Sequence, residues 1–173
     1  MKIRPFKPED RPRLIEIANT AFEPIWAMYR TAFGQAIVDL EFPGCEGRIG
    51  RNVDDHCTRF PQWLFVCEDG GEVAGFVTFL LKPDMKLGIV DDNAVDPRHQ
   101  GKGIAVAMYN AVLSFMREQG MAYARVTTGL DDAHAPARHA YEKAGFTLRH
   151  EDVTYYADLQ SRATPVPQGS TEP

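Results

Sequence analysis

The most informative segment of the chain is Asp96-Pro97-Arg98-His99-Gln100-Gly101-Lys102-Gly103-Ile104-Ala105, a polar loop between two apolar patterns. Residues 86–95 before it have the pattern of a strand. Beyond it, apolar residues at 104, 108, 111, 112 and 115 fall on one helical face. Glycines let a backbone approach a ligand closely, and the free N–H groups at a helix start attract anions. The segment therefore predicts a phosphate-binding loop that leads into a long helix.

The side chains and spacing of this loop narrow its function. Arg98 and Lys102 add positive charge to an otherwise acidic chain. The spacing is not G-x-G-x-x-G, which disfavours a dinucleotide fold, and it is not the G-x-x-x-x-G-K-[ST] of a Walker loop. On the glycines alone, a flexible connection between strand and helix is an equal alternative, because such spacing is a weak signal.

The pattern around the loop predicts a mixed sheet. Strands are expected at 2–6, 63–67, 73–81, 86–95, 123–127 and 146–158. Helices are expected at 8–22, 49–59, from 104 to a stop at 119–120, and at 136–143, with more helix between 26 and 38. Glycines at 70 and 71 predict a hairpin between two strands. The strand–helix–strand order over 86–127 implies one parallel crossover. The fold class is thus α/β or α+β: a mixed, mostly antiparallel sheet covered by helices.

Length and composition limit the remaining possibilities. The 173 residues are 44% apolar and 25% charged, which fits one ordinary domain, expected over 1–160. Residues 161–173 contain three prolines and few core formers, so a flexible tail is expected there. A net charge of −5 disfavours nucleic acid as a partner. No segment approaches a membrane span, and the N-terminus lacks the apolar region of a secretory signal, so a cytoplasmic protein is expected.

A second motif follows one strand and one helix later. It is His134-Ala135-Pro136-Ala137-Arg138-His139-Ala140-Tyr141-Glu142-Lys143-Ala144-Gly145-Phe146. Together the two motifs resemble the GNAT superfamily of acyl-CoA-dependent N-acetyltransferases. That family carries a [QR]-x-x-G-x-[GA] loop, matched by Arg98, Gly101 and Gly103. It also carries N-x-x-A-x-x-x-Y followed by E-K-x-G-F, matched by Ala137, Tyr141 and residues 142–146, with His134 where the family often has Asn.

The resemblance implies a fold and a co-substrate, acetyl-CoA. The family's sheet splits between its fourth and fifth strands, and the pantetheine arm of CoA enters the gap. Backbone groups of residues 93–95 would pair with that arm, and the N–H groups of residues 100–105 would hold the pyrophosphate. The expected cofactor-binding residues are Asn93, Ala94, Val95, Arg98, Gln100, Gly101, Lys102, Gly103, Ile104, Ala105, His134 and Ala137.

The resemblance also implies catalytic roles. A Tyr at the position of Tyr141 protonates the leaving CoA thiolate in this family, and an acidic residue often stands near the acceptor amine at the position of Asp91. Strand alternation places Asp91 on the face of Asn93 and Asp92 on the other, which favours Asp91 as the base. A carboxylate near pKa 4 is a poor base unless burial raises its pKa or water relays the proton. A bulge in the strand would exchange the two faces.

Other chemistries find little support in the sequence. Cys45, Cys57 and Cys67 form no C-x-x-C pair, and no ligand spacing predicts a metal site. No serine stands in G-x-S-x-G, and no residue is placed as a covalent nucleophile. The expected reaction is direct transfer of acetyl from acetyl-CoA to a primary amine of a small molecule or peptide. A non-catalytic CoA-binding or interaction domain is the alternative, and the last strand offers a route to a homodimer.

Overall fold

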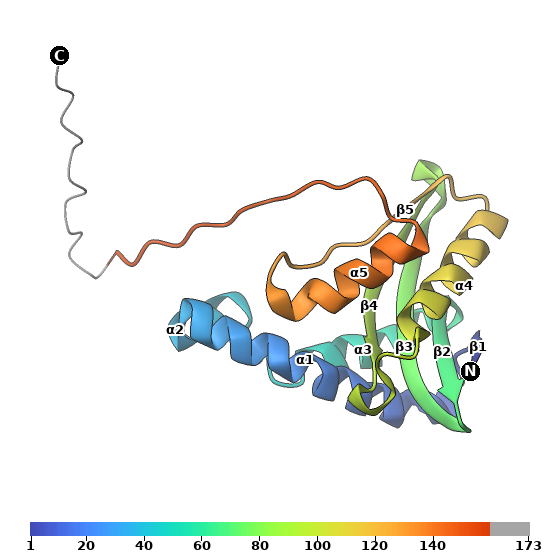
Figure 1. Ribbon diagram of the computed structural model, residues 1–173, viewed down its shortest axis with the longest axis horizontal. Helices are drawn as coiled ribbons and strands as arrows, with labels where there is room; N and C mark the ends of the chain where they lie inside the picture. Colours follow the sequence, from blue (N-terminus) through green and yellow to red (C-terminus); the bar gives the residue numbers. More distant parts are fainter. Residues whose placement is uncertain (160–173) are drawn as a thin grey trace, which may run out of the picture.

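The computed structural model describes residues 1–159 and contains one five-stranded sheet with the order β1-β2-β3-β4-β5 (Figure 1). The strands are β1 (Lys2–Pro5), β2 (Leu64–Asp69), β3 (Glu72–Lys82), β4 (Leu87–Val95) and β5 (Tyr123–Arg125). The first four pair antiparallel, and β5 pairs parallel with β4. The predicted fold class, hairpin and parallel crossover are therefore confirmed.

Helices cover both faces of the sheet. They are α1 (Arg11–Phe33), α2 (Gln35–Glu41), α3 (Arg48–Arg59), α4 (Ile104–Glu118) and α5 (Ala135–Ala144). One buried cluster joins α1, α2 and α3 to the sheet through Leu14, Val53 and Phe76. A second joins α4 and α5 to the other face through Val77, Met108 and Tyr141. The sheet thus separates two helical layers, and β4 has one layer on each side.

The helix predicted over 8–22 begins at Arg11 and continues to Phe33. An aromatic cluster fixes this second half. The Trp26 ring lies 5.6 Å from the Phe42 ring, and Tyr29 stacks on Phe42 at 5.3 Å. Since aromatic contacts of this kind bury a large apolar area, they hold the end of α1 against the segment that follows α2.

The strand predicted over 146–158 is wrong. This segment has no strand structure, and most of its side chains are exposed, Leu148 and Tyr155 almost completely. A strand requires a hydrogen-bonding partner, and the segment instead runs past α5 to place Tyr156 against Phe33, 5.8 Å between ring centres (Figure 1). The tail predicted over 161–173 lies outside the described residues.

A β-bulge interrupts β4. Val77 pairs with Asn93 and Phe79 pairs with Val90, so Asp91 and Asp92 together lie opposite Thr78. The Thr78 hydroxyl donates to the Asp92 carbonyl at 2.9 Å. The expected alternation from Leu87 to Val95 is therefore wrong, because one extra residue exchanges the faces. Val90 packs with α4, whereas Ala94, which simple alternation would put on the same face, packs with α1 and α3.

The sheet splits where β5 ends. β5 pairs only with residues 87–89 of β4, and among the described residues no strand pairs with that edge of β4 from Val90 to Val95. On its other edge, the same part of β4 pairs with β3. Half of the backbone groups of residues 90–95 thus face a gap beside α4 and α5, as the resemblance implied.

Candidate active site

The predicted phosphate loop lies at the end of β4 and turns directly into α4. Gly101 and Gly103 have φ of +78° and +77°, a conformation that favours glycine, and Gly103 is the N-cap of α4. A Cβ atom added at either position would meet nothing within 4 Å. The first amides of α4, at Ile104 and Ala105, have no intrahelical acceptor. Open space above two glycines beside free amides fits a pyrophosphate group.

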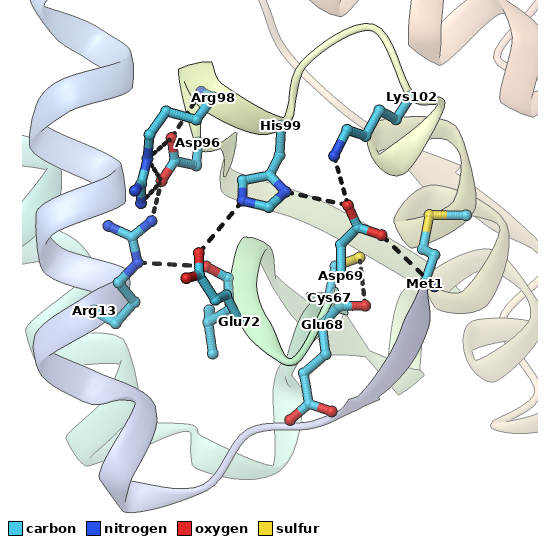
Figure 2. Close-up of polar contacts among 11 residues, drawn as sticks. Met1, Arg13, Cys67, Glu68, Asp69, Glu72, Asp96, Arg98, His99 and Lys102 are labelled. Atoms are coloured by element: carbon cyan, nitrogen blue, oxygen red, sulfur yellow. Dashed lines mark hydrogen bonds and ion pairs between the residues drawn. The ribbon is translucent and has the colours of Figure 1, made fainter.

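The cationic side chains of the loop are already paired with carboxylates. Figure 2 shows Arg98 and Arg13 on either side of Asp96, with Arg98 Nη2 at 2.9 Å from the carboxylate. Lys102 Nζ lies 2.8 Å from Asp69, the last residue of β2 before the turn to β3. The charges of Arg98 and Lys102 are thus largely balanced within the protein, and attraction of an anion falls mainly to the backbone amides.

Asp69 ties the loop to the β2–β3 turn. Its carboxylate accepts a hydrogen bond from Lys102 Nζ. It also lies 3.2 Å from His99 Nδ1 and 3.7 Å from the terminal amine of Met1 (Figure 2). Hydrogen bonds from Lys102 and His99 lower the pKa of Asp69 to about 2. His99 Nε2 also lies 3.7 Å from Glu72, so the loop contacts both sides of the turn.

Asp96 links the loop to α1, and its loss should weaken the fold. Hydrogen bonds from Arg98, then from Arg13, hold the pKa of this buried carboxyl far below its usual range, against the effect of burial. A depressed folded pKa contributes stability above the unfolded value near ~3.9, and the contribution fades as pH falls below it. Asp96→Asn should therefore lower the melting temperature at pH 7, and its difference from wild type should shrink below about pH 4.

Melting scans of the two proteins from pH 7 downward check this expectation. The matched control is Asp84→Asn, which changes an exposed carboxyl in the turn after β3 and should leave the melting temperature unchanged. A difference for Asp96→Asn that stays constant down to pH 2 would mean that the Asp96 charge does not stabilise the fold.

Tyr141 reaches β4 from α5. Its side chain is buried, and its hydroxyl oxygen lies 3.1 Å from Asn93 Nδ2 beside the gap in the sheet. Burial raises the pKa of Tyr141, as does the Asp92 charge, while hydrogen bonds involving Asn93 and Tyr109 oppose the rise. The phenol is therefore protonated at neutral pH and can act as a proton donor.

The two carboxylates on the bulge lie in different surroundings. Asp91 is exposed, whereas Asp92 is partly buried on the side of α3. Burial and the neighbouring Asp91 charge raise the pKa of Asp92 to about 6, although Asn52 and Arg48 oppose this. The structure thus gives Asp92 the raised pKa that a base near neutral pH requires.

His134 and Ala137 occupy the start of α5. His134 Nδ1 lies 2.8 Å from Asp131, and its ring lies 6.4 Å from that of Tyr29 in α1. Ala137 is partly buried against the cluster under α4. The structure therefore brings Asn93 and the loop together with Tyr141, while the His134 imidazole is held by Asp131 and turned toward α1.

Sequence reasoning missed Tyr109 and the side chain of Asn93. Tyr109 is 2% exposed, and its hydroxyl donates to Asn93 Oδ1 at 2.6 Å. The one sequence signal that Tyr109 is buried is its position, because it directly follows Met108 on the apolar face of α4. A buried Tyr hydroxyl needs a polar partner, and a nearby strand is where that partner would be sought.

The described part of the chain holds neither a cluster of metal ligands nor a membrane-spanning helix. Within residues 1–159, no three His, Cys, Asp or Glu side chains converge on a possible metal position. No helix of the same residues is long and apolar enough to cross a membrane. His56, next to Cys57, is buried with Nε2 3.0 Å from the Trp63 carbonyl oxygen, which is a packing role.

Comparison with known proteins identifies the class. The model of the acetyltransferase (GNAT) family matches residues 14–146. This chain belongs to the GNAT family of acetyltransferases. It is similar to Ard1 from Thermoplasma volcanium, with 25% identity, coverage of 86% of this chain and 84% of that one, and a TM-score of 0.64. It shares its fold with the PaiA N-acetyltransferase of Thermoplasma acidophilum solved with coenzyme A, at 14% identity, 87% and 92% coverage and a TM-score of 0.66.

Curated relatives are longer than this chain. A streptothricin acetyltransferase from Streptomyces lavendulae is 29% identical over 118 residues, which are 68% of this chain and 60% of that protein. A mycothiol acetyltransferase from Segniliparus rotundus is 37% identical over 153 residues, 86% of this chain and 52% of that protein. The chain thus spans between half and two thirds of the length of these two relatives.

Proposed function

We propose that this protein transfers an acetyl group from acetyl-CoA to a primary amine, directly within a ternary complex. The observation that carries the proposal is the gap between β4 and β5, which ends at the open Gly101–Gly103 loop and has the Tyr141 hydroxyl beside it. Acetyl-CoA supplies the activated thioester. The exposed backbone of residues 93–95 is suited to pair with an extended arm, and the amides at the start of α4 are suited to hold a pyrophosphate.

Tyr141 and Asp92 divide the proton transfers in this proposal. Asp92 takes a proton from the attacking ammonium group, directly or through one water, and Tyr141 gives its phenol proton to the departing sulfur. The two groups lie on opposite sides of β4, because the bulge turns Asp92 toward α3 while Asn93 faces α5. A reacting carbonyl at the open edge of β4 would therefore have a base on one side and an acid on the other.

The alternative is a domain that binds CoA without catalysis. It shares the loop and the gap but needs neither a raised pKa at Asp92 nor a buried phenol at the gap, and both are present. These two features favour the enzyme. A homodimer and a cytoplasmic location stay predictions, as does the single domain over 1–160.

The test of the proposal is release of CoA thiol from acetyl-CoA with a panel of amines. The panel holds a polyamine, an aminoglycoside, a free amino acid, a peptide with a free N-terminus and a peptide with lysine. Thiol release that depends on one amine, together with a product heavier by one acetyl group, supports the enzyme. A rise in melting temperature with acetyl-CoA but no release with any amine would support the binding domain.

The base assignment predicts a distinctive pH dependence. Asp92 must be ionised to accept a proton, so kcat/KM should rise as pH passes about 6. Asp92→Asn should lose this rise and be roughly 10²-fold slower at pH 7, the lower limit typical of a general base, and recover at high pH, where free amine is abundant. Asp91→Asn is the matched control on the neighbouring residue and should cost much less. Equal, pH-independent losses in both variants would mean that neither carboxylate is the base.

A further inference from the structure

A group of three polar side chains, two buried tyrosines and a partly buried asparagine, connects α4, β4 and α5. Asn93 of β4 lies at its centre, between Tyr109 of α4 and Tyr141 of α5, whose rings are 4.7 Å apart. The Tyr109 hydroxyl lies 2.6 Å from Asn93 Oδ1, and the Tyr141 hydroxyl lies 3.1 Å from Asn93 Nδ2. Tyr109 is too deeply buried to touch a substrate.

The directions of the two shorter hydrogen bonds between Asn93 and the tyrosines follow from one carbonyl. Asn93 Nδ2 lies 2.9 Å from the Asp91 carbonyl oxygen, which can only accept. The amide nitrogen must therefore be on that side, where it also donates to the Tyr141 oxygen. The opposite atom, Oδ1, is an acceptor and receives the Tyr109 proton. The Tyr141 hydroxyl oxygen thus accepts a hydrogen bond from Asn93 Nδ2. Its own proton takes no part in that bond and can be donated to another acceptor.

Asn93 Oδ1 is an acceptor that competes for the Tyr141 proton. Asn93 Oδ1 lies 3.4 Å from the Tyr141 hydroxyl, a long hydrogen bond, while Tyr109 holds the same atom at 2.6 Å. Without the Tyr109 hydroxyl, Oδ1 would have only Tyr141 as a donor in this group. A small rotation of Tyr141 would then direct its proton to the amide instead of the gap.

We propose that Tyr109 is a positioning residue, whose hydroxyl occupies Asn93 Oδ1 and so keeps the Tyr141 proton directed toward the gap between β4 and β5. This inference rests on the proposed function, in which Tyr141 donates that proton to the sulfur of CoA and regains one from solvent. It assigns a catalytic consequence to a side chain in the core that neither motif contains.

The test is a double-mutant cycle on turnover, with acetyl-CoA and the amine of the panel that releases thiol fastest. Tyr109→Phe should lower kcat about fivefold, the scale of one neutral hydrogen bond. The KM for acetyl-CoA should not change, because the Tyr109 side chain is only 2% exposed and cannot touch the ligand. In the Tyr141→Phe background, the same change should have no further effect, since the proton that it positions is gone. Tyr155→Phe, an exposed tyrosine, is the matched control and should be wild type.

The outcomes separate this inference from the proposed function. A Tyr109→Phe effect that is as large in the Tyr141→Phe background as in wild type would show a general loosening of the core and overturn the positioning role. Wild-type kcat in Tyr109→Phe, with a large loss in Tyr141→Phe, would overturn the inference and leave the acid assignment intact. Wild-type kcat in Tyr141→Phe would overturn both. Melting curves of each variant report folding independently of activity.

Discussion

Tyr141→Phe should lower turnover roughly 10²-fold, the scale of a lost general acid, while acetyl-CoA binding stays close to wild type. The variant removes one hydroxyl and keeps the ring, which packs against Tyr109 at 4.7 Å and Phe146 at 5.8 Å. Asn93 Nδ2 keeps the Asp91 carbonyl as an acceptor at 2.9 Å, so no buried donor is left without a partner. The fold should therefore persist, and the loss should fall on the chemical step.

The physical reason is the leaving group. A thiol of pKa near ~8.5 leaves readily as a thiolate, yet in a partly closed gap its charge is poorly solvated, and a phenol at hydrogen-bond distance can supply a proton as the bond breaks. Burial raises the pKa of Tyr141, which keeps that proton in place at neutral pH. Water remains as a slower donor, so activity should fall rather than vanish.

Steady-state turnover measures the expected loss of activity, and the melting-temperature shift with acetyl-CoA measures whether binding is retained. A normal shift with reduced kcat supports the acid role. Wild-type turnover would make Tyr141 a packing residue, and a lost shift would mean that the hydroxyl serves binding instead.

Local signals were sufficient for the loop and its surroundings. The glycines at 101 and 103 predict a loop because glycine readily adopts positive φ angles, as both residues do, and the helical face beginning at Ile104 predicts α4. Arg98 and Lys102 look like free cations in the sequence. Their partners Asp96 and Asp69 show otherwise, and Asp69, at the end of β2, is 33 residues away from Lys102, a distance that no local pattern spans.

The predicted alternation of faces along β4 failed for a related reason. Alternation along β4 favours Asp91, and it fails because β3 offers one residue, Thr78, to two on β4. A bulge depends on the register between two strands, which single-strand periodicity does not contain. The strand expected over 146–158 failed similarly, since its apolar residues suit a strand but no edge of the described sheet pairs with it.

Gly103→Glu should abolish the rise in melting temperature that acetyl-CoA produces. The new side chain would start in the open space above the N-cap of α4 and place a negative charge where we propose that the pyrophosphate binds. A ligand that binds only the folded state stabilises it by mass action, so a lost site means a lost shift. Gly103→Gln has nearly the same size without the charge, and it should keep part of the shift.

A second glycine separates loss of binding from backbone strain. Gly120 follows α4 with φ of +79° and, like Gly103, has nothing within 4 Å of an added Cβ. Glutamate at either position pays the cost of the left-handed conformation, roughly 1–2 kcal/mol. Gly120→Glu should therefore melt earlier than wild type and still respond to acetyl-CoA, whereas Gly103→Glu should melt earlier and not respond. If folded Gly103→Glu showed the same rise in melting temperature with acetyl-CoA as wild type, the pyrophosphate would bind away from this loop. The first turn of α4 would then not be the anion site.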